Sequence, residues 1–212
     1  MKNVNDILDE ILKAAQKEMD FDQREIHVIE LLRVYLEYRS HDGRSWLSYA
    51  ECLRLTGRID ESMQAMLTSL GLAPEDKRSA IYGRIGFLCS KYRSPQEAES
   101  WYYLGTSSEY CSEGWIWLLR GVNLSVLGRN EEALECFKES RKFEDVDKGE
   151  IALNIGLVAR TCGNYEEASN NFKEALEIDP DCSAARECLE GLQGISETLD
   201  LISQLTINKD SP

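Results

Sequence analysis

A spacing of 35 residues recurs along the chain and limits its possible folds more than any other feature. Gly86, Gly121 and Gly156 are separated by this spacing. Three alanines keep the same spacing, and an aromatic residue follows each by four positions: Ala98 with Tyr102, Ala133 with Phe137, and Ala168 with Phe172. A period of a few tens of residues is typical of chains built from stacked copies of one small unit.

An earlier copy precedes these three and departs from them at two positions. Ala50 stands where the later copies have Gly, and Met66 stands where they have the aromatic residue. The distance from Ala50 to Gly86 is 36, which implies one inserted residue. The chain therefore contains four copies, at residues 43–78, 79–113, 114–148 and 149–182.

Each copy is interpreted as a hairpin of two amphipathic helices, because apolar residues recur every three or four positions in each half. Gly57, Gly128 and Gly163 lie between the halves, where a turn is needed. Pro74 and Pro180 follow the second halves and would stop a helix. Small residues are expected where the two helix axes approach closely. These are Ala50, Gly86, Gly121 and Gly156 in the first helices and Ser62, Ala98, Ala133 and Ala168 in the second.

The pattern resembles the tetratricopeptide repeat. The fourth copy matches it best, through Ile155, Gly156, Gly163, Tyr165, Ala168, Phe172, Ala175 and Pro180. The resemblance covers residues 43–182. It implies an all-α, right-handed superhelical solenoid of helix-turn-helix repeats.

The two ends of the chain are expected to bracket this array. Residues 1–42 are interpreted as a degenerate helical hairpin whose second helix starts with a capping box at Asp22 and Glu25. Residues 183–212 are interpreted as a C-terminal capping helix and a frayed tail, because the last hairpin of an array needs its apolar face covered. Gly191 keeps the 35-residue spacing, and an amphipathic stretch runs over 195–205.

Composition and charge exclude several classes of protein. Lys and Arg number 24 against 38 Asp and Glu, so the formal net charge is −14. This charge disfavours nucleic acid and membrane surfaces as partners. Asp6, Asp9 and Glu10 interrupt the apolar residues that a secretory signal would need, so we expect a cytoplasmic protein. The cysteines are odd in number and scattered along the chain, so they are interpreted as small buried thiols. They are Cys52, Cys89, Cys111, Cys136, Cys162, Cys182 and Cys188.

In the family that the sequence resembles, the first helices line a concave groove. The family's groove positions carry an apolar set here, namely Phe87, Trp115, Leu118, Val122, Leu153 and Leu157. Arg54, Arg84 and Arg160 would lie at its edge, and Glu51 and Lys91 also occupy groove positions. An exposed patch of this kind usually marks a docking site. Three alternatives stay open: the terminal helices of the chain cover the patch, the patch belongs to the core, or the register is misaligned.

The aromatic residues Trp101, Tyr103 and Trp115 are further candidates for contact with a partner. The family's clamp for the C-terminal carboxylates of heat-shock chaperones is disfavoured, because Leu47 and Glu51 stand where its first Lys and Asn would be. An amphipathic helix or an extended apolar segment fits the groove residues better.

No pattern indicates catalysis, a cofactor or a metal. His27 and His41 have no nucleophile or metal-ligand motif near them, and no phosphate-binding loop occurs. The pairs Glu131–Glu132 and Glu166–Glu167 are interpreted as favouring the start of second helices. The sequence thus predicts a noncatalytic protein-interaction module that binds a peptide segment or helix. The alternative is an acidic neutralising partner, such as an immunity protein or a secretion-type chaperone, and self-association is also possible.

Overall fold

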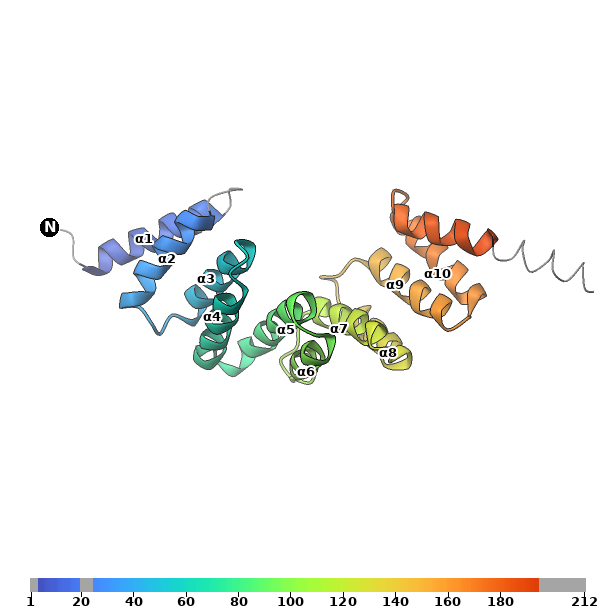
Figure 1. Cartoon of the computed structure of the whole chain (residues 1–212), viewed down its shortest axis with the longest axis horizontal. Helices are drawn as coiled ribbons and strands as arrows, with labels where there is room; N and C mark the ends of the chain where they lie inside the picture. The colour runs from blue at the N-terminus through green and yellow to red at the C-terminus, as the bar shows by residue number, and fades with distance from the viewer. Residues whose placement is uncertain (1–3, 20–24, 195–212) are drawn as a thin grey trace, which may run out of the picture. The chain divides into compact units, whose positions relative to one another are not determined.

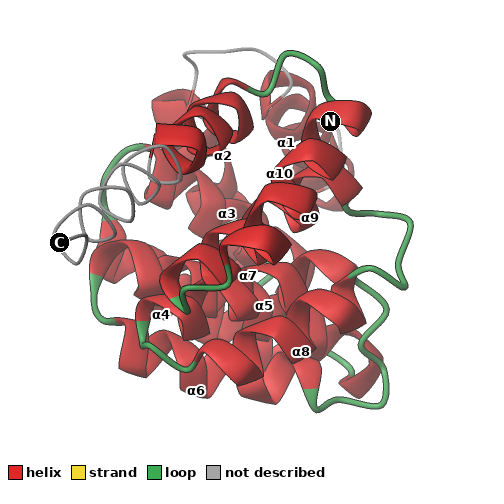
Figure 2. Ribbon diagram, turned by 90° about the vertical axis from the view of Figure 1, so that its right-hand side faces the viewer, coloured by secondary structure: helices red, strands yellow, loops and turns green. Residues whose placement is uncertain are grey.

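A computed structural model describes residues 4–19 and 25–194 of the chain (Figure 1). Within these residues every regular element is a helix, and loops join the helices without any strand (Figure 2). The predicted all-α class is therefore confirmed. No helix of the described part is both long and apolar enough to cross a membrane. The chain divides into two compact units, residues 1–111 and 112–212.

The described residues of unit 1 form three antiparallel helix pairs, and each pair packs on the next. Trp46 and Tyr49 of the third helix pack against Leu8, Tyr35 and Leu36 of the leading pair. The helices are α1 (Val4–Met19), α2 (Glu25–Tyr38), α3 (Gly43–Leu55), α4 (Ile59–Leu72), α5 (Glu75–Tyr92) and α6 (Pro95–Thr106).

In its described residues, 112–194, unit 2 contains two further pairs and a last helix over 183–194. Its helices are α7 (Gly114–Val126), α8 (Asn130–Ser140), α9 (Lys148–Thr161) and α10 (Tyr165–Ile178). The apolar core of α7 and α8 continues into α9 through Ile151 and Val158. The division of the sequence into 1–42, 43–182 and 183–212 stays a prediction.

Glycines in the first helices make room for aromatic rings of the second helices. A Cβ atom on Gly121 would lie 2.5 Å from Cε1 of Phe137, and that ring is fully buried. Gly86 faces Tyr102 and Gly156 faces Phe172 in the same way. The expected close approach is confirmed, and its cause is a ring from the partner helix that occupies the place of a side chain.

The first copy solves the same packing problem with different residues. Ala50 and Met66 are both fully buried and occupy the positions that Gly and the aromatic residue hold in later copies. The Ser62 hydroxyl donates a hydrogen bond of 2.7 Å to the Ala50 carbonyl, so the two helices are also in polar contact there. The side chain of Met66 is slimmer than an aromatic ring and thus leaves room for the methyl group of Ala50.

The turns between paired helices use left-handed backbone at three glycines, as the sequence predicts. Gly57, Gly128 and Gly163 have φ values of 78°, 74° and 81°. Residues with a Cβ rarely adopt this conformation. Pro74 lies immediately before α5, and Pro180 lies in the turn after α10, so both follow a second helix as predicted.

The open ends of three hairpins are joined by a serine–glycine hydrogen bond that the sequence analysis did not anticipate. Ser69 Oγ donates to the Gly43 carbonyl at 2.7 Å, and Ser140 Oγ donates to the Gly114 carbonyl at 2.9 Å. The second copy exchanges the two residue types, because Ser79 on its first helix donates to the Gly105 carbonyl on its second, at 3.0 Å. Each bond holds the start of a first helix against the end of its partner.

Some expectations at the ends and for the thiols need correction or lie outside the description. Asp22 and the stretch 195–205 lie outside the described residues. Gly191 belongs to the last helix but has no atom within 4 Å of its Cβ position, so it marks no close helix approach. All seven cysteines are described and none forms a disulfide. Cys52, Cys89 and Cys136 are buried as expected, whereas Cys162 is exposed and the other three are partly exposed.

Candidate functional site

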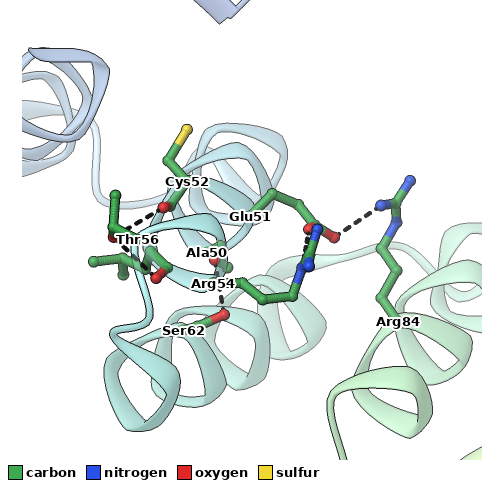
Figure 3. A network of polar contacts seen from close by, with 8 residues as sticks. Ala50, Glu51, Cys52, Arg54, Thr56, Ser62 and Arg84 are labelled. Atoms are coloured by element: carbon green, nitrogen blue, oxygen red, sulfur yellow. Dashed lines mark hydrogen bonds and ion pairs between the residues drawn. The ribbon is translucent and has the colours of Figure 1, made fainter. Parts of the chain in front are cut away.

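Three predicted groove residues come together on the first helices of unit 1. Glu51 on α3 accepts a hydrogen bond of 2.8 Å from Nε of Arg54, one helical turn further along. Its second oxygen accepts a hydrogen bond of 2.9 Å from Nη1 of Arg84, which lies on α5 (Figure 3). Glu51 therefore joins two neighbouring hairpins through two guanidinium groups.

Phe87 lies beside this ion-pair network. The Arg54 guanidinium carbon is 5.6 Å from the centre of the Phe87 ring, and Lys91 Nζ is 5.9 Å from it. The same ammonium is 5.6 Å from the centre of the Tyr92 ring. At such distances a cation–π interaction contributes about 0.5–1 kcal/mol at an exposed site. We call Glu51, Arg54, Arg84, Phe87 and Lys91 the α3–α5 face.

Exposure shows what the α3–α5 face offers to a ligand. The Arg54 and Glu51 side chains are 19% and 20% exposed, and the Arg84 side chain is 43% exposed. The Arg84 end of the network is open to solvent, and exposed ion pairs contribute little to folding, about 0–1 kcal/mol. Their main effect is to fix the guanidinium groups next to a partly exposed aromatic ring.

The predicted residues of α7 divide between surface and core. Trp115 and Val122 are partly exposed, and Val122 packs on the core of unit 2. Leu118 is only 4% exposed and belongs to that core. This corrects the expectation that Leu118 lines an open groove, since its side chain is turned into the packing among α7, α8 and α9.

The predicted residues of α9 lie close to the last described helix, over 183–194. Leu153 and Leu157 are partly buried and pack in one cluster with Cys188 and Leu189 of the helix over 183–194. Arg160 Nη1 donates a hydrogen bond of 3.5 Å to Cys188 Sγ. The alternative that a terminal helix covers part of the patch therefore applies to this end of the predicted groove.

The three aromatic candidates differ in their surroundings. Trp101 stacks on Tyr82 with ring centres 6.1 Å apart, so it contributes to packing within unit 1. Tyr103 is 55% exposed on α6, a second helix. The predicted groove residues belong to both units, and one continuous groove through all of them stays a prediction.

Ionisable groups outside the α3–α5 face include buried side chains and carboxylates at the starts of helices. Burial raises the pKa of the Cys89 thiol to about 12, with Glu97 acting in the same direction. Burial also raises the pKa of the Tyr102 hydroxyl to about 12. Glu131, Glu132 and the pair Glu166–Glu167 lie in the first turns of α8 and α10, as predicted. In the described part of the chain, no three His, Cys, Asp or Glu side chains are grouped so as to hold a metal ion.

Comparison with known proteins gives the family. The family model for the tetratricopeptide repeat matches residues 43–76 and 149–182, the first and fourth copies. The chain is a tetratricopeptide repeat protein. Solved structures agree with this fold. Most of this tetratricopeptide repeat protein can be superposed on MamA, with a TM-score of 0.70 and 14% identity over 84% of this chain and 94% of MamA.

Two further structures are similar in fold. A tetratricopeptide repeat protein from Parabacteroides merdae ATCC 43184 has a TM-score of 0.75 and 14% identity, over 97% of this chain and 80% of that one. YrrB, described as a TPR protein with an unusual peptide-binding site, has a TM-score of 0.68 and 15% identity, over 85% of this chain and 90% of its own. At these identities the likeness shows the fold alone.

The curated relatives are Photosystem I assembly proteins named Ycf3. The protein from Prochlorococcus marinus (strain NATL1A) is 32% identical over 100 residues, which are 46% of this chain and 56% of the relative. The Synechococcus sp. (strain CC9311) protein is 31% identical over 70 residues, 32% of this chain and 40% of the relative. The tetratricopeptide repeat protein thus matches between two fifths and three fifths of the length of these relatives.

Proposed function

We propose that the chain is a noncatalytic, cytoplasmic interaction module whose first helices bind a segment of another protein. The observation that carries this proposal is the α3–α5 face, where a partly exposed Phe87 lies between cationic groups that neighbouring hairpins hold in place. An aromatic anchor with charged groups at its edge is the usual composition of an interface centre. Seven cysteines without a disulfide fit a reducing compartment.

The comparisons support the general class of this function. Tetratricopeptide repeats serve as protein-binding scaffolds, and one structural neighbour is described as having a peptide-binding site. The curated relatives are described as assembly proteins. On this basis the module would bring a partner protein into contact with further components, as a scaffold or adaptor.

The α7–α9 residues take a secondary part in this proposal. Trp115 on α7 is partly exposed and is the second aromatic anchor that we propose. Leu153, Leu157 and Arg160 lie beside the last helix, so they contribute where that helix leaves them accessible. Leu118 is not included, because it is buried.

Substitution of the two anchors tests the proposal. The full chain is used to capture partners from a native lysate, and Phe87→Ala and Trp115→Ala are compared with Tyr103→Ala. The control removes an equally aromatic, exposed side chain from a second helix. We expect both anchor variants to lose a stoichiometric partner while their far-ultraviolet circular dichroism is unchanged, and the control to retain it. Retention of the partner by both anchor variants would overturn the proposal.

The acidic neutraliser remains a second candidate, because the net charge of −14 would favour a basic client. Salt distinguishes the two. Binding through apolar anchors should persist at high ionic strength, whereas binding through long-range charge should weaken steeply. Recovery of the same chain alone would indicate self-association through the first helices.

A further inference from the structure

The charge of the four repeats is divided between their first and second helices. Every first helix of a repeat carries a net positive charge: +1 on α3, +2 on α5, +1 on α7 and +1 on α9. Every second helix carries a net negative charge: −2 on α4, −2 on α6, −3 on α8 and −3 on α10. The first helices of the repeats are therefore positively charged although the net charge of the chain is −14.

In unit 1 this positive charge gathers around Phe87. Arg54 and Arg84 each donate one hydrogen bond to Glu51, and a guanidinium group has five N–H donors. Lys91 is exposed, and among the described residues it makes no ion pair with a carboxylate. Three cations thus lie around one carboxylate, and the two more exposed ones, Arg84 and Lys91, keep N–H groups that an acceptor from outside can reach.

Local charge outweighs net charge at the distances of a bound complex. At physiological ionic strength, salt screens the interaction between charges that are more than about 8 Å apart. The acidic second helices therefore repel a ligand carboxylate only weakly when it is bound among the cations. A ligand carboxylate at Arg84 and Lys91 would form charge-assisted hydrogen bonds, and a neighbouring apolar side chain would cover the Phe87 ring.

We propose that the α3–α5 face binds an acidic segment of the partner protein, with a carboxylate at Arg84 and Lys91 and an apolar side chain on Phe87. This inference rests on the proposed function and specifies the chemistry of the partner. It is opposite in sign to the expectation from net charge, which favours a basic partner.

Selection from a display library of random peptides tests the inference with the full chain, at about 0.15 M salt. We expect the enriched peptides to carry net negative charge together with aromatic or aliphatic residues. One enriched acidic peptide is then titrated, by fluorescence anisotropy, with the double variant Arg84→Gln/Lys91→Gln. Loss of two partly exposed contacts should weaken its affinity about tenfold.

The matched control is Lys138→Gln/Lys142→Gln, which removes the same two charges from exposed positions on and after α8. It should leave the affinity unchanged, and thermal unfolding should show that both variants are folded. Enrichment of neutral or basic peptides, or equal affinities for the two double variants, would overturn the acidic inference and leave segment binding standing. Failure of any peptide to be enriched over the naive library would overturn segment binding as well.

Discussion

Gly121→Ala is the substitution whose effect follows most directly from the structure. The added Cβ would lie 2.5 Å from Cε1 and 2.7 Å from Cδ1 of Phe137, distances at which the ring must move. The ring is fully buried, so it has little room to do so. Overpacking of a core costs about 1–3 kcal/mol, whereas replacing Gly by Ala within a helix gains about 0.5–1 kcal/mol. We expect the free energy of unfolding to fall by about 1–2 kcal/mol.

Urea titration followed by far-ultraviolet circular dichroism measures this change, and hydrogen exchange of the α7 and α8 amides shows where it acts. The control is Gly71→Ala in α4, where no atom lies within 4 Å of the Cβ position. The control should leave the protein unchanged or stabilise it by up to about 1 kcal/mol, because only helix propensity changes.

The first copy suggests a compensating substitution. Ala50 and Met66 occupy there the positions of Gly121 and Phe137, so Phe137→Met should recover much of the stability that Gly121→Ala loses. The two changes should be non-additive by about 1 kcal/mol, as is usual for residues in contact. If the effects simply add, or if Gly121→Ala behaves like Gly71→Ala, ring packing does not explain the glycine.

Three further predictions concern the hairpin ends, the turns and alkaline pH. Ser140→Ala removes a buried hydrogen bond to the Gly114 carbonyl and should cost about 1 kcal/mol in a urea titration. Gly163→Ala should cost about 1–2 kcal/mol because its φ is 81°, whereas Gly191→Ala in the last helix should be stabilising by about 0.5–1 kcal/mol. The pKa of Tyr102 is about 12 in the folded protein and about 10 in the unfolded chain. Its contribution to stability is therefore complete below pH 10. Between pH 10 and 12 the free energy of unfolding falls by up to about 1.4 kcal/mol per pH unit, because the unfolded chain loses the tyrosine proton first.

Each of these has a control. Ser125→Ala removes a hydroxyl that bonds within its own helix, to the Val122 carbonyl, and should change stability less than Ser140→Ala. Equal effects would contradict the role given to the hairpin end. An Ala at Gly163 that costs no more than one at Gly191 would show that the turn does not need left-handed backbone. Tyr102→Phe should reduce the loss of stability between pH 10 and 12, and an unchanged pH profile would assign that loss to other groups.

The sequence by itself determined the repeated hairpin and the residues on which it depends. The 35-residue spacing, the turn glycines and the small residues act within one hairpin, where steric limits leave few alternatives. The sequence alone identified Gly86, Gly121 and Gly156, because the need for a small residue recurs once in each repeat. The direct contact, in which an aromatic ring of the second helix lies where the Cβ of the residue would be, needed the structure.

Only the tertiary structure decided which groove residues are accessible and which charges meet. Glu51 and Arg84 are 33 positions apart and belong to different hairpins, and no local pattern signals their ion pair. Leu118 matched a family groove position, yet the packing of α7 against its neighbours buries it. The rotation of each helix about its axis settles such outcomes, because it depends on all the side chains packed around that helix at once.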